Sequence, residues 1–528
     1  MTDEDAVVDR RRFVGRLAAA GGVAAGATVG SSVLFPTAAS AATDIDLTNT
    51  ARVKNALDAA NDQDYVTKKQ VKNGNPIIVA ASGQPAEVQA AALLSGGGVC
   101  DGTNDQVEIQ AALLAGSTSG RAVMLSAGTF NVDTVSHVNW PGAYTALYMY
   151  NGSRLLGRGS SATTIRLINN ATHNTANNNA YMITNQFPNT TGNTDILVGD
   201  LTVDGNAAGQ TGLNKCFHGI AFWRTNRTQC ERVVVQNMRG LTSVDQNETF
   251  AFDVLLGANA SFIECRATRV TGSTASGFSV NYGTAVRYYG CVAENMTVGM
   301  GFTSYMATQL SYANCLSRNN GNVGFNWEFC DNVSFSGCHA GGLASSSAGG
   351  VPYANNQSFG NTQHGFRGAG NGTQGFRAEL VGCTSTRNGG NGLMLDNTRD
   401  VRVVGGAFTN NDKGVVVFPD TAARSTRLEG VAVSANTTAQ YDVPGNYAAA
   451  FGTLPIPAMP ASNVAYYHNL PFDAVVYLNG GTFSTVKLTD RNGVVTDLGA
   501  QRTVVVAPGC GITITYTAAP TWKWMGGG

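Results

Sequence analysis

The sequence carries little charge and no excess of either sign. Charged residues make up 13% of the 528 residues, and 34 Lys and Arg balance 35 Asp and Glu to a net charge of −1. Proteins that bind nucleic acid ordinarily present a basic patch to the phosphate backbone. Neither half of this chain is visibly basic, which argues against a nucleic acid as the partner.

Long apolar runs and a cysteine framework are also missing. After residue 41 no segment approaches the run of about eighteen apolar residues that a membrane-spanning helix needs. Ten cysteines are too dilute for a disulfide scaffold, and there is no C-x-x-C pair of the kind that binds zinc. What the chain does have is 64 Gly and 43% hydrophobic residues, a composition that favours a folded, turn-rich β-protein.

The N-terminus has the features of an export signal. Arg10–Arg12 precede a weakly apolar stretch that ends at Phe35, and residues 39–41 are small, as a signal peptidase requires. The pattern resembles a twin-arginine signal peptide over residues 1–41, with an N-terminal anchor helix as the alternative. We therefore expect an extracellular mature protein without a membrane anchor, beginning with an N-terminal extension and cap over residues 42–99.

The middle of the chain contains an internal repeat. A Gly-Phe pair recurs with a cysteine fourteen residues after the glycine, and the copies begin 24 and 23 residues apart. A unit of this length cannot bury its own apolar face, so the copies must stack as a solenoid of parallel strands. The three clearest copies are Gly277–Phe278 with Cys291, Gly301–Phe302 with Cys315, and Gly324–Phe325 with Cys338. Looser copies follow Gly219, Gly365, Gly392 and Gly414, and a copy without glycine is aligned at Thr249–Phe250.

Residues 100–445 resemble the right-handed parallel β-helix superfamily that pectate lyases typify. The resemblance rests on the repeat and on its opening, where Cys100–Asp105 leads into a helical segment at 106–114 and an apolar strand pattern at 121–130. In that superfamily such an opening is the capping helix and the first coil. The resemblance implies an all-β fold and a secreted, carbohydrate-active protein.

Two ladders are expected from the repeat. The recurring cysteines fall at equivalent positions and predict an inward, packing column of thiols rather than a metal site; they are Cys265, Cys291, Cys315, Cys338 and Cys383. Asn295 and Asn319, four residues after their cysteines, are predicted to stack at a turn and hydrogen-bond along the axis. A Cys216–Cys230 disulfide is the one pairing that stays open.

The C-terminal region differs in character from the repeat. Residues 446–462 form a linker rich in Ala and Pro, and residues 463–528 alternate between apolar runs and turns. This pattern predicts a small antiparallel β-module. It either binds carbohydrate or mediates oligomerisation, or it caps the last edge of the solenoid.

Counting from the repeat glycine as position zero aligns the coils in columns, because strand residues alternate between core and solvent. Position one is apolar and faces inward. Position four faces solvent and holds Trp223, Asp253, Asn281, Tyr305, Glu328, Ala369, Asp396 and Phe418, and position two holds Ser279, Thr303, Asn326 and Arg367. We call these two columns the outer strip. Its acids, amides and aromatic rings are of the kind that bind sugars.

Glu328 and Asp396 are the predicted catalytic pair. They lie two coils apart, so adjacent strands ~4.8 Å apart place them roughly 9.6 Å from each other. This estimate lies at the upper edge of the ~6.5–9.5 Å that separates the two carboxyl groups of inverting glycosidases. The sequence thus predicts a polysaccharide-degrading glycoside hydrolase that needs no cofactor, with the acid and base in unassigned order. Asp253 is predicted to bind substrate or calcium.

Two alternatives remain open from the sequence. A polysaccharide lyase would use Arg367 or His364, with Ca²⁺ to neutralise a uronate, and either side chain would otherwise donate to a carboxylate. A non-catalytic solenoid would bind glycans through the same strip. The marked motifs of polygalacturonases, pectate lyases and alginate epimerases are not reproduced. The expected partner is a polysaccharide or oligosaccharide, and the expected subunit state is a monomer or a homotrimer.

Overall fold

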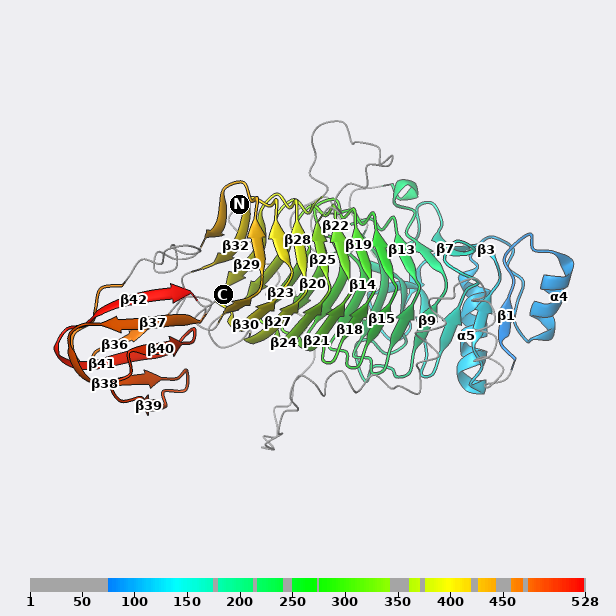
Figure 1. Ribbon diagram of the computed structural model, residues 1–528. Coiled ribbons are helices and arrows are strands. Elements are labelled where there is room, and N and C mark those ends of the chain that lie inside the picture. Colours follow the sequence, from blue (N-terminus) through cyan, green and yellow to red (C-terminus); the bar gives the residue numbers. More distant parts are fainter. Residues whose placement is uncertain are drawn as a thin grey trace. The chain divides into compact units, whose positions relative to one another are not determined.

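A computed structural model describes residues 75–173, 179–211, 216–240, 249–272, 275–341, 360–370, 376–418, 426–442, 457–468 and 473–526. Within these ranges most of the chain forms three sheets that follow one another around a coil, and their strands are parallel except for one short antiparallel strand at the edge of the third sheet. The predicted parallel β-helix is therefore confirmed, and Figure 1 shows its strands stacked from cyan to yellow. The predicted signal peptide lies outside the described residues.

The bounds of the elements define the three sheets within the described residues. The first sheet holds, in spatial order, β1 (Ile77–Val79), β2 (Val123–Leu125), β6 (Arg154–Leu156), β9 (Leu197–Gly199), β12 (Gln229–Glu231), β15 (Ser261–Ile263), β18 (Arg287–Tyr289), β21 (Thr308–Ala313), β24 (Asp331–Ser336), β27 (Phe376–Val381), β30 (Arg399–Val404) and β33 (Arg427–Glu429). The second holds β3 (Gly128–Val132), β7 (Thr163–Leu167), β10 (Thr202–Asp204), β13 (Val234–Gln236), β16 (Arg266–Thr268), β19 (Val292–Glu294), β22 (Leu316–Arg318), β25 (His339–Gly341), β28 (Thr384–Thr386), β31 (Ala407–Thr409) and β34 (Ala432–Ser434). The third holds β4 (Val135–Ser136), β5 (Tyr144–Met149), β8 (Asn179–Asn185), β11 (Cys216–Trp223), β14 (Thr249–Leu255), β17 (Ala275–Asn281), β20 (Met300–Tyr305), β23 (Phe325–Glu328), β26 (Phe366–Ala369), β29 (Asn391–Asp396), β32 (Lys413–Val417) and β35 (Ala439–Asp442).

Two helices lie near the start of the solenoid, α4 (Ala86–Leu94) and α5 (Gln106–Ser119), and a short 3-10 helix spans Ala207–Gly209. The predicted helix is thus confirmed, and its side chains Ile109 and Leu113 join the core of the coils. Asp105 precedes α5 and fixes the first coil, because its carboxylate accepts hydrogen bonds from the backbone N–H groups of Gly102 and Asn131 at 2.9 and 2.7 Å. Neither α4 nor α5 is long and apolar enough to cross a membrane, and this holds for every helix in the described ranges.

Aromatic ladders build the core, as position one predicts. On the third sheet Phe252, Phe278, Phe302, Phe325 and Phe366 stack with ring centroids 4.7–4.9 Å apart. A second ladder on the first sheet, from Phe262 to Phe335, meets these rings edge-on. Burying each ring contributes about 1.5–3 kcal/mol, and the repeated stacking fixes which residues of adjacent coils face each other.

The predicted thiol column is confirmed. The five cysteines of the column are buried and free, and their thiols lie against backbone carbonyls; Cys265 Sγ, for instance, is 3.3 Å from the carbonyl oxygen of Cys230. The Cys216–Cys230 pairing is wrong, because neither side chain forms a disulfide. Cys216 Sγ lies instead 3.2 Å from the hydroxyl of Thr249.

The predicted asparagine ladder exists one residue later than expected. Asn295 and Asn319 adopt φ values of +59° and +52°, so they make the turn itself. The following position carries the ladder, in which each buried amide donates to the carbonyl oxygen of the next at 2.8–3.3 Å. Its members are Asn320, Asn361, Asn388, Asn411 and Asn436. Asparagine favours both the left-handed turn and the ladder, so the sequence pattern does not distinguish them.

The C-terminal module is antiparallel, as predicted. Its described strands form one sheet of β36 (Ala465–Tyr467), β41 (Gly511–Ala518), β38 (Thr482–Thr489) and β39 (Val495–Asp497), and another of β40 (Thr503–Val506), β37 (Ala474–Asn479) and β42 (Thr521–Gly526). A core of its own includes Val476, Ile512, Trp522 and Trp524. The proposed linker falls largely outside the described residues.

Candidate active site

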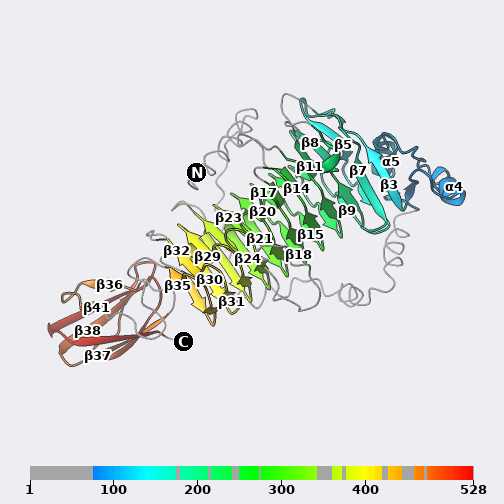
Figure 2. The same cartoon turned by 90° about the horizontal axis from the view of Figure 1, so that it is seen from above.

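The third sheet positions the predicted catalytic pair. Strand pairing aligns Tyr305 with Glu328, Glu328 with Ala369, and Ala369 with Asp396. Glu328 and Asp396 therefore occupy one column and are separated by a single intervening rung, which carries only the methyl group of Ala369. Figure 2 shows β23 and β29 in this stack of strands. The register on which the prediction depends is present in the fold.

Asp253 does not lie in the column where the sequence alignment put it. Its neighbour on the next strand is Ser279, so it belongs to position two, and Leu255 takes position four. The reason is the missing glycine: the copy was aligned at Thr249–Phe250, but the ring that stacks on Phe278 is Phe252, at 4.7 Å. The stacking of Phe252 in the core therefore shifts the alignment of this coil by two residues, from Phe250 to Phe252.

The outer strip is largely buried, whereas the sequence predicts a solvent-facing surface. Trp223, Asp253, Tyr305, Asn326 and Glu328 are each exposed by 4% or less. Asn281, His364, Arg367 and Asp396 are partly buried. Adjacent rungs lie only ~4.8 Å apart, so large outward side chains cover one another. Tyr305, for example, packs edge-on against the rings of Tyr282 and Phe329.

Glu328 is held by a cation and an amide. Arg367 Nη1 lies 2.6 Å from Glu328 Oε1, and Asn326 Nδ2 lies 3.2 Å from the same oxygen. The guanidinium also donates to Asn326 Oδ1 at 3.1 Å, which closes the cluster. The expectation that Arg367 donates to a carboxylate is confirmed. A guanidinium at this distance in a poorly solvated position stabilises the ionised form of Glu328.

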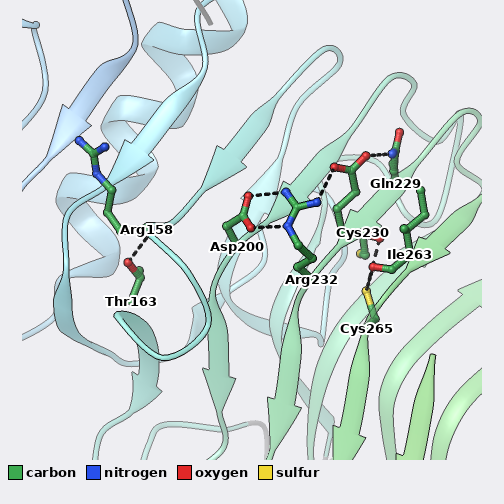
Figure 3. A network of polar contacts seen from close by, with 9 residues as sticks. Arg158, Thr163, Asp200, Gln229, Cys230, Arg232, Ile263 and Cys265 are labelled. Carbon is green, nitrogen blue, oxygen red and sulfur yellow. Dashed lines mark hydrogen bonds and ion pairs between the residues drawn. The ribbon is translucent and has the colours of Figure 1, made fainter. Parts of the chain in front are cut away.

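This ion pair differs from the others on the coils. Its side chains are exposed by only 12% for Arg367 and 4% for Glu328, and no other ion pair of the described residues buries both partners so far. Figure 3 shows a contrasting case, in which Arg232 lies between Asp200 and the strand of Gln229. There Arg232 binds Asp200 through two nitrogens at 2.6 and 2.8 Å and keeps 35% of its side chain exposed. A fully exposed pair such as Arg227 with Asp195, which are 57% and 50% exposed, contributes little to stability, whereas burying both charges is costly.

His364 is oriented by the next rung. Its Nδ1 accepts a hydrogen bond from the backbone N–H of Asn391 at 3.0 Å. An imidazole that accepts at Nδ1 carries its proton on Nε2, so the outer nitrogen is a donor and not a base. This arrangement disfavours His364 as the base of a lyase.

An aromatic cluster at the N-terminal end of the same sheet was missed by sequence reasoning. Trp223 donates its indole N–H to Asp253 Oδ2 at 2.8 Å and packs against Trp140, with ring centroids 4.3 Å apart. Tyr181 stacks on Trp140 on one side and on His218 on the other, at 5.1 and 4.7 Å. Burial lowers the pKa of His218 to about 3, so this imidazole is neutral at ordinary pH. The sequence signal for this cluster is the position directly before the repeat glycine. It holds His218, and strand pairing aligns Tyr181 with His218 on the neighbouring strand.

Metal ligands gather elsewhere in the described residues. Cys100, Asp105 and Glu108 form the one group of three side chains whose ligand atoms lie within 4.8 Å of one another, and it is at the start of the solenoid. Asp105 is already committed to backbone N–H groups, and burial together with the nearby acids raises the pKa of the Cys100 thiol. This group fits a role in fixing the first coil. Whether Ca²⁺ acts on the outer strip stays a prediction.

The known proteins that resemble this chain do so in structure and not in sequence. No protein-family model matches the sequence, and no curated protein matches it. Among solved structures, the A-module of the Azotobacter vinelandii mannuronan C-5 epimerase AlgE4 is 19% identical with a TM-score of 0.46, over 64% of this chain and 91% of that chain. The catalytic domain of a GH87 alpha-1,3-glucanase is 11% identical with a TM-score of 0.38, over 64% of each chain. The Dettilon tailspike protein is 10% identical with a TM-score of 0.39, over 79% of this chain and 91% of that chain. These neighbours are parallel β-helix proteins, and the three parallel sheets described above place the chain in the same fold class.

Proposed function

We propose that the protein is a secreted polysaccharide-degrading glycoside hydrolase in which Glu328 is the general base and Asp396 the general acid. The observation that carries the proposal is the buried cluster of Glu328, Arg367 and Asn326 on the outer face of the third sheet. A solenoid needs no buried ion pair outside its core, and leaving charges there is costly. A role in chemistry accounts for that cost.

The roles follow from the surroundings of the two carboxyl groups. The guanidinium of Arg367 favours the carboxylate form of Glu328, which is the form that can remove a proton from water. Asp396 is partly buried two rungs further on, at roughly 9.6 Å by strand spacing, so a water and a glycosidic bond fit between the two. The intervening Ala369 contributes no bulky group to that space. We therefore expect inversion of the anomeric centre.

A lyase is less well supported by these contacts. Arg367 donates to Glu328 and Asn326, and a guanidinium offers only donors and no acceptor, so it is a poor base. His364 presents a protonated Nε2, as shown above. The side chains that the lyase alternative needs are thus committed as donors.

The test is a panel of neutral and anionic polysaccharides, with measurement of reducing ends and product analysis. We expect reducing-sugar release by the full chain, and a fall in kcat of about 10²–10⁴-fold in Glu328→Gln and in Asp396→Asn. Glu379→Gln is the matched control, because Glu379 also pairs with an arginine but is 42% exposed on the first sheet. Products with the ultraviolet absorbance of unsaturated uronates would show a lyase instead, and full activity in both variants would remove the assignment of the pair.

Export and assembly belong to the same proposal. The arginine-rich start and the small residues at 39–41 support twin-arginine export of the folded chain, and the N-terminal sequence of the secreted protein tests it. Monomer and homotrimer stay open predictions that light scattering distinguishes.

A further inference from the structure

Trp140 differs from the other tryptophans in its exposure. All five tryptophans lie in the described residues, and four of them are exposed by 5% or less. Trp140 is only partly buried. Tryptophan is a large ring with an apolar face and one polar N–H, and a solvent-accessible tryptophan on a protein surface commonly marks a binding site.

The segment that carries Trp140 is well ordered by its own contacts. It connects β4 and β5, which pair as an antiparallel hairpin at the edge of the third sheet. The backbone N–H of His137 donates to Ala143 O at 2.9 Å, and that of Ala143 donates to Trp140 O at 3.0 Å. The ring of His137 is buried and its Nδ1 accepts from the backbone N–H of Asn139 at 3.2 Å. Trp140 is thus held in place before any ligand arrives, which lowers the entropic cost of binding.

Other rings support one side of Trp140. Tyr181 stacks under it with an interplanar angle of 28°, and Trp223 packs against it at a tilt of 53°. Trp223 is itself fixed by its hydrogen bond to Asp253. We call the group of Trp140, Tyr181 and Trp223 the aromatic platform. The packing of the other two rings holds Trp140 in a fixed orientation.

The aromatic platform lies on the same face as the proposed catalytic pair. Tyr181 and Trp223 belong to β8 and β11, and Glu328 to β23 of the same third sheet. From Trp223 the column passes through Leu255, Asn281 and Tyr305 before it reaches Glu328. Four rungs of ~4.8 Å amount to roughly 19 Å. The rise per rung is close to the length that one pyranose unit adds to a polysaccharide, so a chain lying along the strip spans several units between the two places.

We propose that Trp140 is a remote binding site for the apolar face of a neutral pyranose ring in the same polysaccharide that Glu328 and Asp396 cleave. The inference rests on the proposed function and adds its substrate class, a neutral polymer bound along the solenoid axis. The rings of the platform and its neighbour His218 carry no charge at ordinary pH, since burial keeps this imidazole neutral. Asp253, whose carboxylate accepts the indole N–H of Trp223, offers no positive charge to an anionic sugar.

The test measures binding separately from cleavage. Hexasaccharides of β-1,4-glucan, β-1,3-glucan, β-1,4-mannan and α-1,4-glucan are titrated into the full-length Glu328→Gln variant, with hexagalacturonate as the anionic probe, and tryptophan fluorescence is recorded. We expect at least one neutral hexasaccharide to change the emission, with an affinity that falls about ten-fold in Trp140→Ala and is largely kept in Trp140→Phe. Tyr289→Ala is the control, because Tyr289 is also an aromatic residue of a coil strand, 50% exposed, but lies on the first sheet.

Chain length separates this inference from the proposed function. In the active protein, Trp140→Ala should lower kcat/KM about ten-fold on polymer and leave cleavage of a trisaccharide unchanged, since three units do not span the distance. Binding that depends on Trp140 in a protein without hydrolase activity would uphold the site and refute the enzyme. Equal affinity in Trp140→Ala, preference for hexagalacturonate, or no response to any neutral hexasaccharide would overturn the inference even if the protein cleaves a polysaccharide.

Discussion

Removing Arg367 should cost far more stability than neutralising Glu328. Arg367→Met leaves a carboxylate that is 3% exposed without the guanidinium that now lies 2.6 Å away. Breaking a buried ion pair in this way costs about 3–5 kcal/mol. Glu328→Gln keeps the shape and a carbonyl oxygen that Arg367 can still donate to, so we expect a loss of about 1–2 kcal/mol. The Arg367→Met/Glu328→Gln double variant has no unpaired charge and should recover most of the larger loss.

The double-mutant cycle measures this coupling directly. Urea unfolding is followed by circular dichroism and by tryptophan fluorescence, because a long stack of coils unfolds in one step only if the two signals coincide. We expect a coupling energy of at least about 1.5 kcal/mol between the two positions. If Arg367→Met fails to fold, Arg367→Lys is measured in its place. It keeps the charge, so its loss of stability should be less than half of the about 3–5 kcal/mol expected for Arg367→Met. A coupling near zero, with equal losses in both single variants, would mean that the pair is solvated and would refute the burial on which the proposed role of Glu328 depends.

Three further predictions concern the coils. Asn388→Ala breaks the amide ladder on both sides and should cost about 2–4 kcal/mol in urea unfolding, whereas Asn319→Gly should be nearly neutral because φ at this turn is +52°. Below pH 6.5 the unfolded chain protonates His218, whereas the folded chain excludes this proton down to about pH 3. The free energy of unfolding should therefore fall by about 1.4 kcal/mol per pH unit in this window. His218→Gln should remove that part of the slope in acid titrations followed by circular dichroism. In the folded protein a thiol reagent should modify no cysteine other than Cys510, because the other nine are buried, and after unfolding it should modify all ten, because none forms a disulfide. Several fast-reacting thiols in the folded state would contradict the packing of the core.

The features that the sequence predicts well are those that the core determines. The Gly-Phe repeat identifies the inward ring of each coil, and Phe278, Phe302, Phe325 and Phe366 do stack in one ladder. The same count places Glu328 and Asp396 in one column. A repeat carries this information because each coil is bounded by its neighbours on both sides, so a single alignment fixes many positions at once.

The features that the sequence does not predict depend on side-chain reach. Burial of the outer strip follows from how large groups such as Trp223 and Tyr305 lean over adjacent rungs, and alternation along a strand gives only their direction. The contact of Arg367 with Glu328 is of the same kind, because it joins neighbouring columns on adjacent strands. The contribution of Trp140 comes from a hairpin outside the repeat, which no alignment of the coils includes.

The packing of the core also fixes the position of the candidate site. Phe325 and Glu328 lie three residues apart on β23, so the ring stacking that positions the first also positions the second. A slip of one residue would turn every side chain of the strand to the other face, carrying Glu328 toward the core and away from Arg367. The misaligned copy shows the same coupling: once Phe252 is recognised as the stacked ring, Asp253 moves into the column of Ser279 and Asn326. For a solenoid of this kind, the outward residues should therefore be numbered from the stacked rings of the core. An error in the alignment of those rings would move every residue of the proposed site to another column.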